Sequence, residues 1–90
     1  MTERKNHNEL LIALGYTTET DEEGFAYLWK DYGNGVEAYA EGAGFAVFVN
    51  DASIYQTGIS IPEEHMTALH NKDFATDDEI RAFDAYLAQL

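Results

Sequence analysis

Basic side chains are scarce in this 90-residue chain, which has 5 Lys and Arg against 17 Asp and Glu, for a formal net charge of −12. None of the five lies in residues 31–71, although that stretch holds six carboxylates. A surface of this charge repels nucleic acid and anionic lipid, so we expect neither as a direct ligand. It favours a cationic partner instead, because such a partner relieves the self-repulsion of the carboxylates.

Cysteine is absent, which excludes disulfides and thiolate metal sites and predicts a reducing, cytoplasmic environment. No apolar run approaches the ~18 residues that a membrane-spanning helix needs, so we expect no membrane partner. Hydrophobic residues nevertheless make up 46% of the chain and aromatic residues 13%, which is enough to build a small core. The length predicts a single domain over residues 1–90.

The N-terminal segment has the spacing of an amphipathic helix over residues 3–14. Its stripe of apolar positions consists of His7, Leu10, Leu11 and Leu14. Gly15 then provides a helix stop. We expect His7 to be a partly buried member of this stripe and not a ligand.

Residues 17–24 form a polar connector that contains Glu19, Asp21, Glu22 and Glu23. Burial of unpaired charge is costly, so we expect this connector to be a loop that projects into water. Charges on such a loop would mainly steer the approach of a partner.

The middle of the chain alternates short runs of apolar residues with turn residues. The runs predict strands over residues 25–32, 36–41, 45–49 and 53–61. The intervening turns are Gly33-Asn34-Gly35, Gly42-Ala43-Gly44 and Asn50-Asp51. Asn-Gly is among the strongest hairpin signals, and turns this short predict an antiparallel β-meander.

Two further helices are expected at the C-terminal end. Pro62 ends the last strand and opens the first of them. Thr76 and Glu79 have the spacing of a capping box for the second. The apolar stripe of this final helix consists of Ile80, Phe83, Leu87 and Leu90. The sequence therefore predicts an α+β domain with the order α-β-β-β-β-α-α.

No pair of residues has the spacing of a catalytic site. Ser60 is close to His65 in sequence, but no Gly-x-Ser-x-Gly elbow surrounds it. Glu37 and Glu41 are four strand positions apart, about 13 Å, which exceeds the carboxylate separation of either class of glycosidase. We therefore expect no enzyme and no catalytic residue, and a minor hydrolase is the least favoured alternative.

Metal-ligand patterns are equally weak. His65 and His70 are five positions apart, so on a helix they point in different directions. Residues 31–35 have only a faint likeness to a calcium loop, because the repeated acidic positions and the terminal Glu of such a loop are missing. We expect no metal site and no cofactor.

One predicted strand face combines carboxylates with an aromatic ring, since Glu37, Tyr39 and Glu41 fall on the same side of strand 36–41. Further candidates for this face are Lys30, Phe48 and Gln56. Tyr is enriched at protein interfaces, because it gives contact area at low entropic cost. Two interpretations stay open: the face binds a partner, or a helix covers Tyr39 and Phe48.

The small size, the negative charge and the α/β-meander layout resemble those of the acidic inhibitors that phages and mobile elements make against host defence. These are the anti-CRISPR and anti-restriction proteins, some of which are DNA mimics. The resemblance covers the whole chain and rests on no motif. It implies a non-enzymatic inhibitor that binds a basic nucleic-acid-binding protein of a CRISPR or restriction system in the host cytoplasm. The alternative is a small acidic regulatory interaction module without DNA mimicry.

Eight residues are expected to contact the partner. They are Glu19, Asp21, Glu22, Glu23, Asp31, Glu37, Tyr39 and Glu41. Tyr39 is the expected aromatic anchor, because aromatic residues are enriched among those that carry most of the binding energy. Glu37 and Glu41 are expected to make fixed contacts, because a strand holds them.

Overall fold

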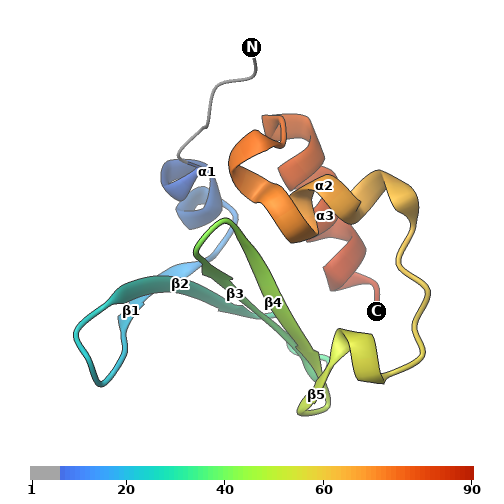
Figure 1. Ribbon diagram of the computed structural model, residues 1–90, viewed down its shortest axis with the longest axis horizontal. Helices are drawn as coiled ribbons and strands as arrows, with labels where there is room; N and C mark the ends of the chain where they lie inside the picture. Colours follow the sequence, from blue (N-terminus) through green and yellow to red (C-terminus); the bar gives the residue numbers. More distant parts are fainter. Residues whose placement is uncertain (1–6) are drawn as a thin grey trace.

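The computed structural model describes residues 7–90, which form an antiparallel sheet with helices packed on it (Figure 1). The α-helices are α1 Asn8–Ala13, α2 Met66–Asn71 and α3 Asp77–Ala88. The strands are β1 Thr17–Thr20, β2 Ala26–Asp31, β3 Val36–Glu41, β4 Gly44–Val49 and β5 Ala52–Ser53. Single 3₁₀ turns lie at Ile54–Gln56, Glu63–His65 and Lys72–Phe74.

The strands pair in chain order, so the sheet is an antiparallel meander. This confirms the predicted α+β class and the meander, with five strands in the described chain where four were predicted. The predicted turns Gly33-Asn34-Gly35 and Asn50-Asp51 lie between the strands as expected, and the predicted turn at residues 42–44 is shorter by one residue, because Gly44 begins β4. In the β4–β5 turn, Asn50 and Asp51 have φ 50° and 69°, the left-handed conformation that suits a two-residue hairpin turn.

Two predictions about the strands were wrong. Residues 17–20 of the acidic connector form the edge strand β1, and all four side chains are exposed, so their polarity costs no burial. The last predicted strand, residues 53–61, ends at Ser53. There Ile54 turns into the core as the start of a 3₁₀ turn, and Gly58 has φ 78°, which does not fit an extended strand.

All three described α-helices lie on the same side of the sheet (Figure 1). Along β3 the burial alternates: Val36, Ala38 and Ala40 are buried on the side of the helices, whereas Glu37 and Tyr39 are half-buried on the other side. The sheet therefore has one covered face and one face without a described α-helix over it.

The buried apolar residues of residues 7–90 form a core between the sheet and the helices. The largest fully buried side chains among them are Phe83, Leu11, Ile54, Leu69, Ile80, Leu87 and Val36. Gly44 allows α2 to approach β4 closely, since a Cβ at this position would lie 2.6 Å from the carbonyl oxygen of Leu69. This close packing fixes the helix layer on the covered face.

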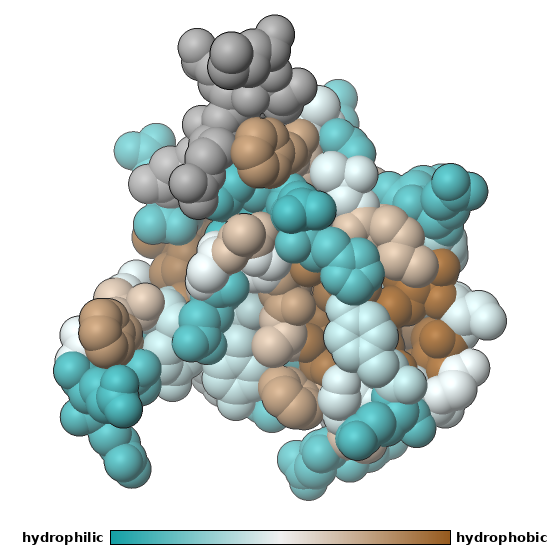
Figure 2. Space-filling model, in the orientation of Figure 1, coloured by the Kyte–Doolittle hydropathy of each residue, from teal (hydrophilic) through white to brown (hydrophobic). Residues whose placement is uncertain are grey.

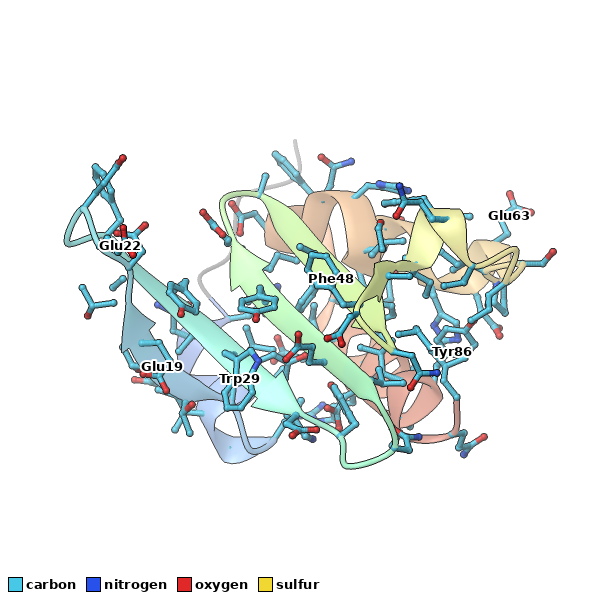
Figure 3. All side chains as sticks on the ribbon, turned by 90° about the horizontal axis from the view of Figure 1, so that it is seen from below. Glu19, Glu22, Trp29, Phe48, Glu63 and Tyr86 are labelled. Atoms are coloured by element: carbon cyan, nitrogen blue, oxygen red, sulfur yellow. The ribbon has the colours of Figure 1, made fainter. Side chains whose placement is uncertain are left out.

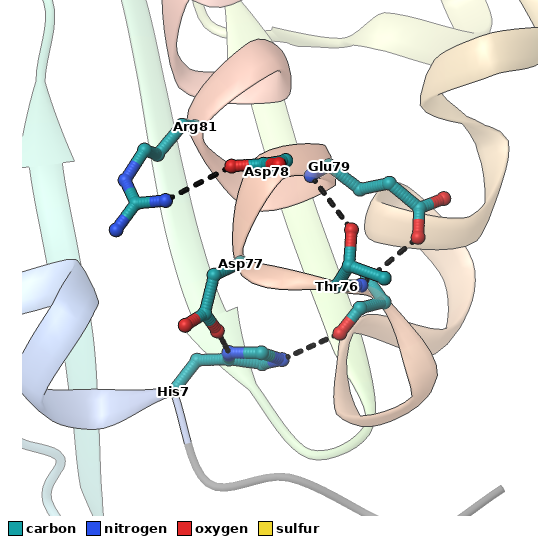
Figure 4. Close-up of polar contacts among 7 residues, drawn as sticks. His7, Thr76, Asp77, Asp78, Glu79 and Arg81 are labelled. Atoms are coloured by element: carbon teal, nitrogen blue, oxygen red, sulfur yellow. Dashed lines mark hydrogen bonds and ion pairs between the residues drawn. The ribbon is translucent and has the colours of Figure 1, made fainter.

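Two sets of polar contacts hold the start of α3 (Figure 4). The predicted capping box is present: Glu79 N donates to Thr76 Oγ1 at 3.1 Å, and Thr76 N donates to Glu79 Oε1 at 2.9 Å. His7 is buried, with Nε2 3.0 Å from the carbonyl oxygen of Ala75 and Nδ1 3.3 Å from Asp77 Oδ1. His7 thus joins the segment before α1 to the start of α3. Residues 3–6 of the first predicted helix lie outside the described residues.

A half-buried polar network links β2 to α1 and α3. Lys30 Nζ donates to the carbonyl oxygen of Leu14 at 2.6 Å and to Asp84 Oδ1 at 2.9 Å, and it lies 4.4 Å from the centre of the Tyr32 ring. Tyr32 donates to the same Asp84 oxygen at 2.6 Å, and its hydroxyl is 2.9 Å from that of Tyr16. Burial above all raises the pKa of both tyrosines, so their hydroxyls stay protonated in the network.

Candidate protein-interaction surface

The sheet face away from the helices, which we call the open face, carries every second side chain of the strands. Its members on β1 to β4 are Thr17, Glu19, Tyr27, Trp29, Asp31, Glu37, Tyr39, Glu41, Ala46 and Phe48. Figure 3 views the molecule from this side, with Trp29 and Phe48 on the near side of the sheet. No α-helix of the described chain lies over Tyr39 and Phe48, so the interpretation that a helix covers them was wrong.

An aromatic row crosses the open face. The ring centres of Tyr27 and Tyr39 are 5.7 Å apart, and those of Tyr39 and Phe48 are also 5.7 Å apart. Trp29 lies beside this row, opposite Tyr39 in the register of β2 and β3. All four rings are half-buried, so they pack on one another and still offer apolar area to a partner.

Carboxylates surround the aromatic row. Glu37 accepts a hydrogen bond from Trp29 Nε1 at 3.1 Å and from the Tyr39 hydroxyl at 3.5 Å, which orients the carboxylate. Desolvation, followed by the charge of Glu37, raises the pKa of Tyr39, so this hydroxyl remains a donor. Glu41 and Asp51 have no side-chain hydrogen bond or ion pair with other residues of the described chain. Their charges are therefore available to a ligand.

None of the Lys and Arg residues within 7–90 lies on the open face. These are Lys30, Lys72 and Arg81, and each is paired with a carboxylate elsewhere in the fold. The expectation that Lys30 and Gln56 join the face of Tyr39 was wrong. The Lys30 side chain lies on the covered side of β2, where it contacts Asp84, and Gln56 belongs to the 3₁₀ turn after β5.

A shallow groove of about 460 Å³ lies in the open face. Its lining consists of Glu37, Tyr39, Glu41, Ala46, Phe48 and Asp51. Ala46 lies opposite Tyr39 in the register of β3 and β4, and its small, exposed side chain leaves room for the groove beside the Tyr39 and Phe48 rings. The groove thus combines aromatic walls with three carboxylates.

The β1–β2 hairpin projects from the body of the molecule, at the lower left in Figure 1 and Figure 2. Asp21 Oδ1 accepts from the backbone N–H groups of Glu23 and Phe25, both at 2.9 Å, so Asp21 fixes the turn. Glu22 lies near the tip (Figure 3), and Phe25 is 66% exposed. Of the four acids predicted to project here, Glu19 belongs to the open face and Asp21 has a structural role. Only the other two present their charge to water at the tip.

The structure adds three open-face residues that sequence reasoning missed, namely Tyr27, Trp29 and Asp51. The three-residue loop Gly33-Asn34-Gly35 could have revealed the first two, because it pairs Trp29 with Tyr39 and places both rings on the Tyr39 side. A two-residue turn at Asn34-Gly35 would instead place Lys30 opposite Tyr39. Nothing in the sequence pattern signalled Asp51, since its position depends on the left-handed turn after β4.

The residues that the sequence offered for catalysis or metal binding differ in burial or make structural contacts. Ser60 is exposed, whereas His65 is buried and stacked on Tyr86 with ring centres 4.6 Å apart. Asp31 Oδ1 accepts from Gly33 N at 2.8 Å and so stabilises the turn after β2. Across residues 7–90, no three His, Cys, Asp or Glu side chains are grouped so that they could hold a metal ion.

The described helices are short, and α3 is the longest at 12 residues. Within residues 7–90 no helix has the length and apolarity to cross a membrane. No protein-family model matches the chain, and neither a curated protein nor a solved structure matches it.

Proposed function

We propose that this protein binds a cationic surface of another protein through its open face, without catalytic turnover. One observation carries the proposal: an uncovered sheet face combines an aromatic row with carboxylates, and no Lys or Arg of residues 7–90 accompanies them. Aromatic rings supply apolar contact area, while the carboxylates select a positive partner and speed its approach. The proposed contact residues are Glu19, Asp31, Glu37, Tyr39 and Glu41 on the open face, with Glu22 and Glu23 on the hairpin.

The charge of the open face disfavours two other classes of partner. A second copy of the chain would bring like carboxylates together, which costs free energy on association. Nucleic acid would meet the same repulsion at its phosphates. A protein surface rich in Lys and Arg avoids both penalties.

The finer proposal is that the partner is a nucleic-acid-binding protein of a host-defence system, CRISPR or restriction, in the host cytoplasm. The carboxylates would then occupy Lys and Arg sites that otherwise hold phosphates. The net charge of −12 on 90 residues supports this proposal, because such a surface competes with nucleic acid for cationic sites.

The aromatic row favours a second candidate, an interaction module that does not imitate DNA. A phosphate mimic needs carboxylates at its contacts, whereas the rings of Tyr27, Tyr39 and Phe48 make apolar and stacking contacts that a phosphate cannot make. Competition separates the two candidates: duplex DNA should displace a mimic from its partner and leave the other kind of complex intact.

Affinity capture from lysate with two charge-matched variants tests the proposal. Glu37→Gln/Glu41→Gln removes two charges from the open face, and Glu63→Gln/Glu64→Gln removes two exposed charges near the start of α2, far from that face (Figure 3). We expect wild type and the second variant to retain a basic protein that the first variant loses. Retention should fall as salt rises, because exposed charges are screened beyond about 8 Å at physiological ionic strength. Equal retention by both variants, or an acidic partner insensitive to salt, would contradict the proposal.

A further inference from the structure

The groove in the open face has the shape and chemistry of a site for one side chain of a partner. We propose that it binds an arginine, with the guanidinium against the aromatic wall and paired with the surrounding carboxylates. This inference rests on the proposed function. It adds the type of side chain that the groove selects and the residues that select it.

Ala46 provides the space for the arginine. In the register of β3 and β4, Ala46 lies opposite Tyr39, and Glu37 lies opposite Phe48. The planes of the Tyr39 and Phe48 rings are perpendicular, so these rings form a corner and not a closed stack. A flat cationic group can therefore enter the groove of about 460 Å³ and lie on a ring face.

Three carboxylates of the groove are placed to pair with that cation. Glu37 is oriented by Trp29 at 3.1 Å and Tyr39 at 3.5 Å, and both are neutral donors that leave its charge uncompensated. Glu41 and Asp51 have no hydrogen-bond or ion-pair partner within the described chain. The left-handed turn holds Asp51 at the edge of the groove. These charges attract a cation and repel an anion.

The combination of ring and carboxylate favours arginine over lysine. A guanidinium is planar and weakly hydrated, so it can stack on an aromatic ring and donate a fork of N–H groups to carboxylates at the same time. An ammonium is compact and strongly hydrated, and it gains mainly from the attraction between charges. We expect a preference of about two- to fivefold for arginine, because stacking on an exposed ring is worth a factor of this size and the ammonium gains less of it.

Two short peptides test this inference, a Gly-Arg repeat and its Gly-Lys counterpart of the same length and charge, both acetylated and amidated. Each is titrated into ¹⁵N-labelled protein while the backbone and indole signals are followed by NMR. Trp29 is the single Trp of the chain, and its Nε1–H donates to Glu37, so its indole signal reports directly on a wall of the open face.

The Arg peptide should bind about two to five times more tightly than the Lys peptide. The largest shifts should fall on β3, β4 and the Trp29 indole. Ala46→Leu fills the groove without changing the charge, so it should abolish the preference while weak binding of both peptides persists. Ala82→Leu, the same change at an exposed position of α3, should leave the preference intact.

Three results would overturn the inference. Equal affinity of the two peptides at the groove would refute the arginine site but would not contradict the proposed function. A preference that survives Ala46→Leu in a folded variant would also remove it. Shifts confined to the hairpin or to α3 would overturn both the arginine site and the proposed use of the open face. If Ala46→Leu does not fold, the comparison of the two peptides on wild type decides the matter.

Discussion

On the covered face of the sheet, Asp84 accepts from the Tyr32 hydroxyl at 2.6 Å and from the Lys30 ammonium at 2.9 Å. The same ammonium lies 4.4 Å from the centre of the Tyr32 ring. The Asp84 carboxylate therefore accepts from a tyrosine, pairs with a cation, and has an aromatic ring next to that cation. All three groups come from its own chain.

On the open face, Glu37 has the donors without the cation. It accepts from Trp29 Nε1 and from the Tyr39 hydroxyl, and no Lys or Arg of residues 7–90 approaches it. The comparison teaches that a cation, a carboxylate and a tyrosine are all present where α3 packs on the covered face. On the open face the carboxylate and the tyrosine are present without the cation. An arginine in the groove would give Glu37 a cationic partner, as Lys30 does for Asp84.

The largest expected effect is on the free energy of unfolding, which should fall much more for a substitution under the covered face than for one on the open face. Phe83 is 1% exposed in the core, whereas Phe48 is half-buried on the open face. Phe83→Ala should lower the free energy of unfolding by roughly 3–5 kcal/mol, and Phe48→Ala by only about 1–2 kcal/mol. Urea denaturation measures both, and Phe83→Leu gives a milder version if the alanine variant does not fold. A larger loss at Phe48 would show that the open face belongs to the core.

The second prediction compares the two carboxylate sites. Lys30→Met should cost about 1–3 kcal/mol of stability, because it leaves the charge of Asp84 uncompensated in a half-buried position. Glu37→Gln should change stability by about 0.5 kcal/mol or less, since this carboxylate has no cation to lose. The double variant Lys30→Met/Asp84→Asn should recover part of the first loss in the same thermal or urea unfolding experiment. No recovery would mean that Lys30 acts by packing alone.

Alkaline pH gives the third prediction. The pKa values of Tyr16 and Tyr32 are raised above 10.0, mainly by burial, so the folded state keeps these protons longer than the unfolded state does. The free energy of unfolding should therefore fall as pH rises above about 10, by up to about 1.4 kcal/mol per pH unit for each tyrosine, and these groups should have no effect at neutral pH.

Phenylalanine variants isolate the contribution of these two tyrosines from that of every other group. Tyr16→Phe/Tyr32→Phe should flatten the alkaline slope of stability, as followed by urea unfolding at each pH. Tyr39→Phe should change the slope less, because Tyr39 is closer to solvent. Equal slopes for all variants would rule out the buried tyrosines as the source.

The smallest expected effect concerns the rate of binding to the captured partner. Glu22→Gln/Glu23→Gln removes two charges at the hairpin tip and should slow association by about threefold, with little change in dissociation. Glu37→Gln/Glu41→Gln should mainly speed dissociation, because these residues lie at the fixed contact. Asp21 is left unchanged in both variants, since its carboxylate holds the hairpin turn. Surface plasmon resonance separates the two rates, and the reverse pattern would place the main contact on the hairpin.

The parts of the fold that the sequence predicted well depend on neighbours in the chain. The Asn-Gly turn, the alternation over residues 36–41 and the capping box at Thr76 are all of this local kind. Strand β1 was missed because its residues are polar and become a strand only by pairing with β2. The last strand was overextended because Ile54, Ile59 and Ile61 have strand-like composition. In the structure Ile54 belongs to the core, and Ile59 and Ile61 pack against it.

The candidate site, too, was predictable from the sequence only where it depends on residues that are close together in the chain. Alternation along one strand was enough to group Glu37, Tyr39 and Glu41. Which face the helices cover depends on tertiary packing, so the sequence left that question open. Trp29 requires the register of β2 and β3, and without this register Lys30 was assigned to the wrong face.

Strand β1 is at the edge of the sheet, next to a face that carries four aromatic rings. An edge of this kind can template pairing with other chains, which leads to aggregation. Glu19 on β1 and the carboxylates around the aromatic row act as gatekeepers while they are ionised, because they keep the sheets of two copies apart. Replacing these carboxylates with amides, as in Glu19→Gln/Glu37→Gln/Glu41→Gln, should remove this protection and allow the sheets to stack. The acidity of the chain would then prevent aggregation of the free protein as well as favour binding to a cationic partner.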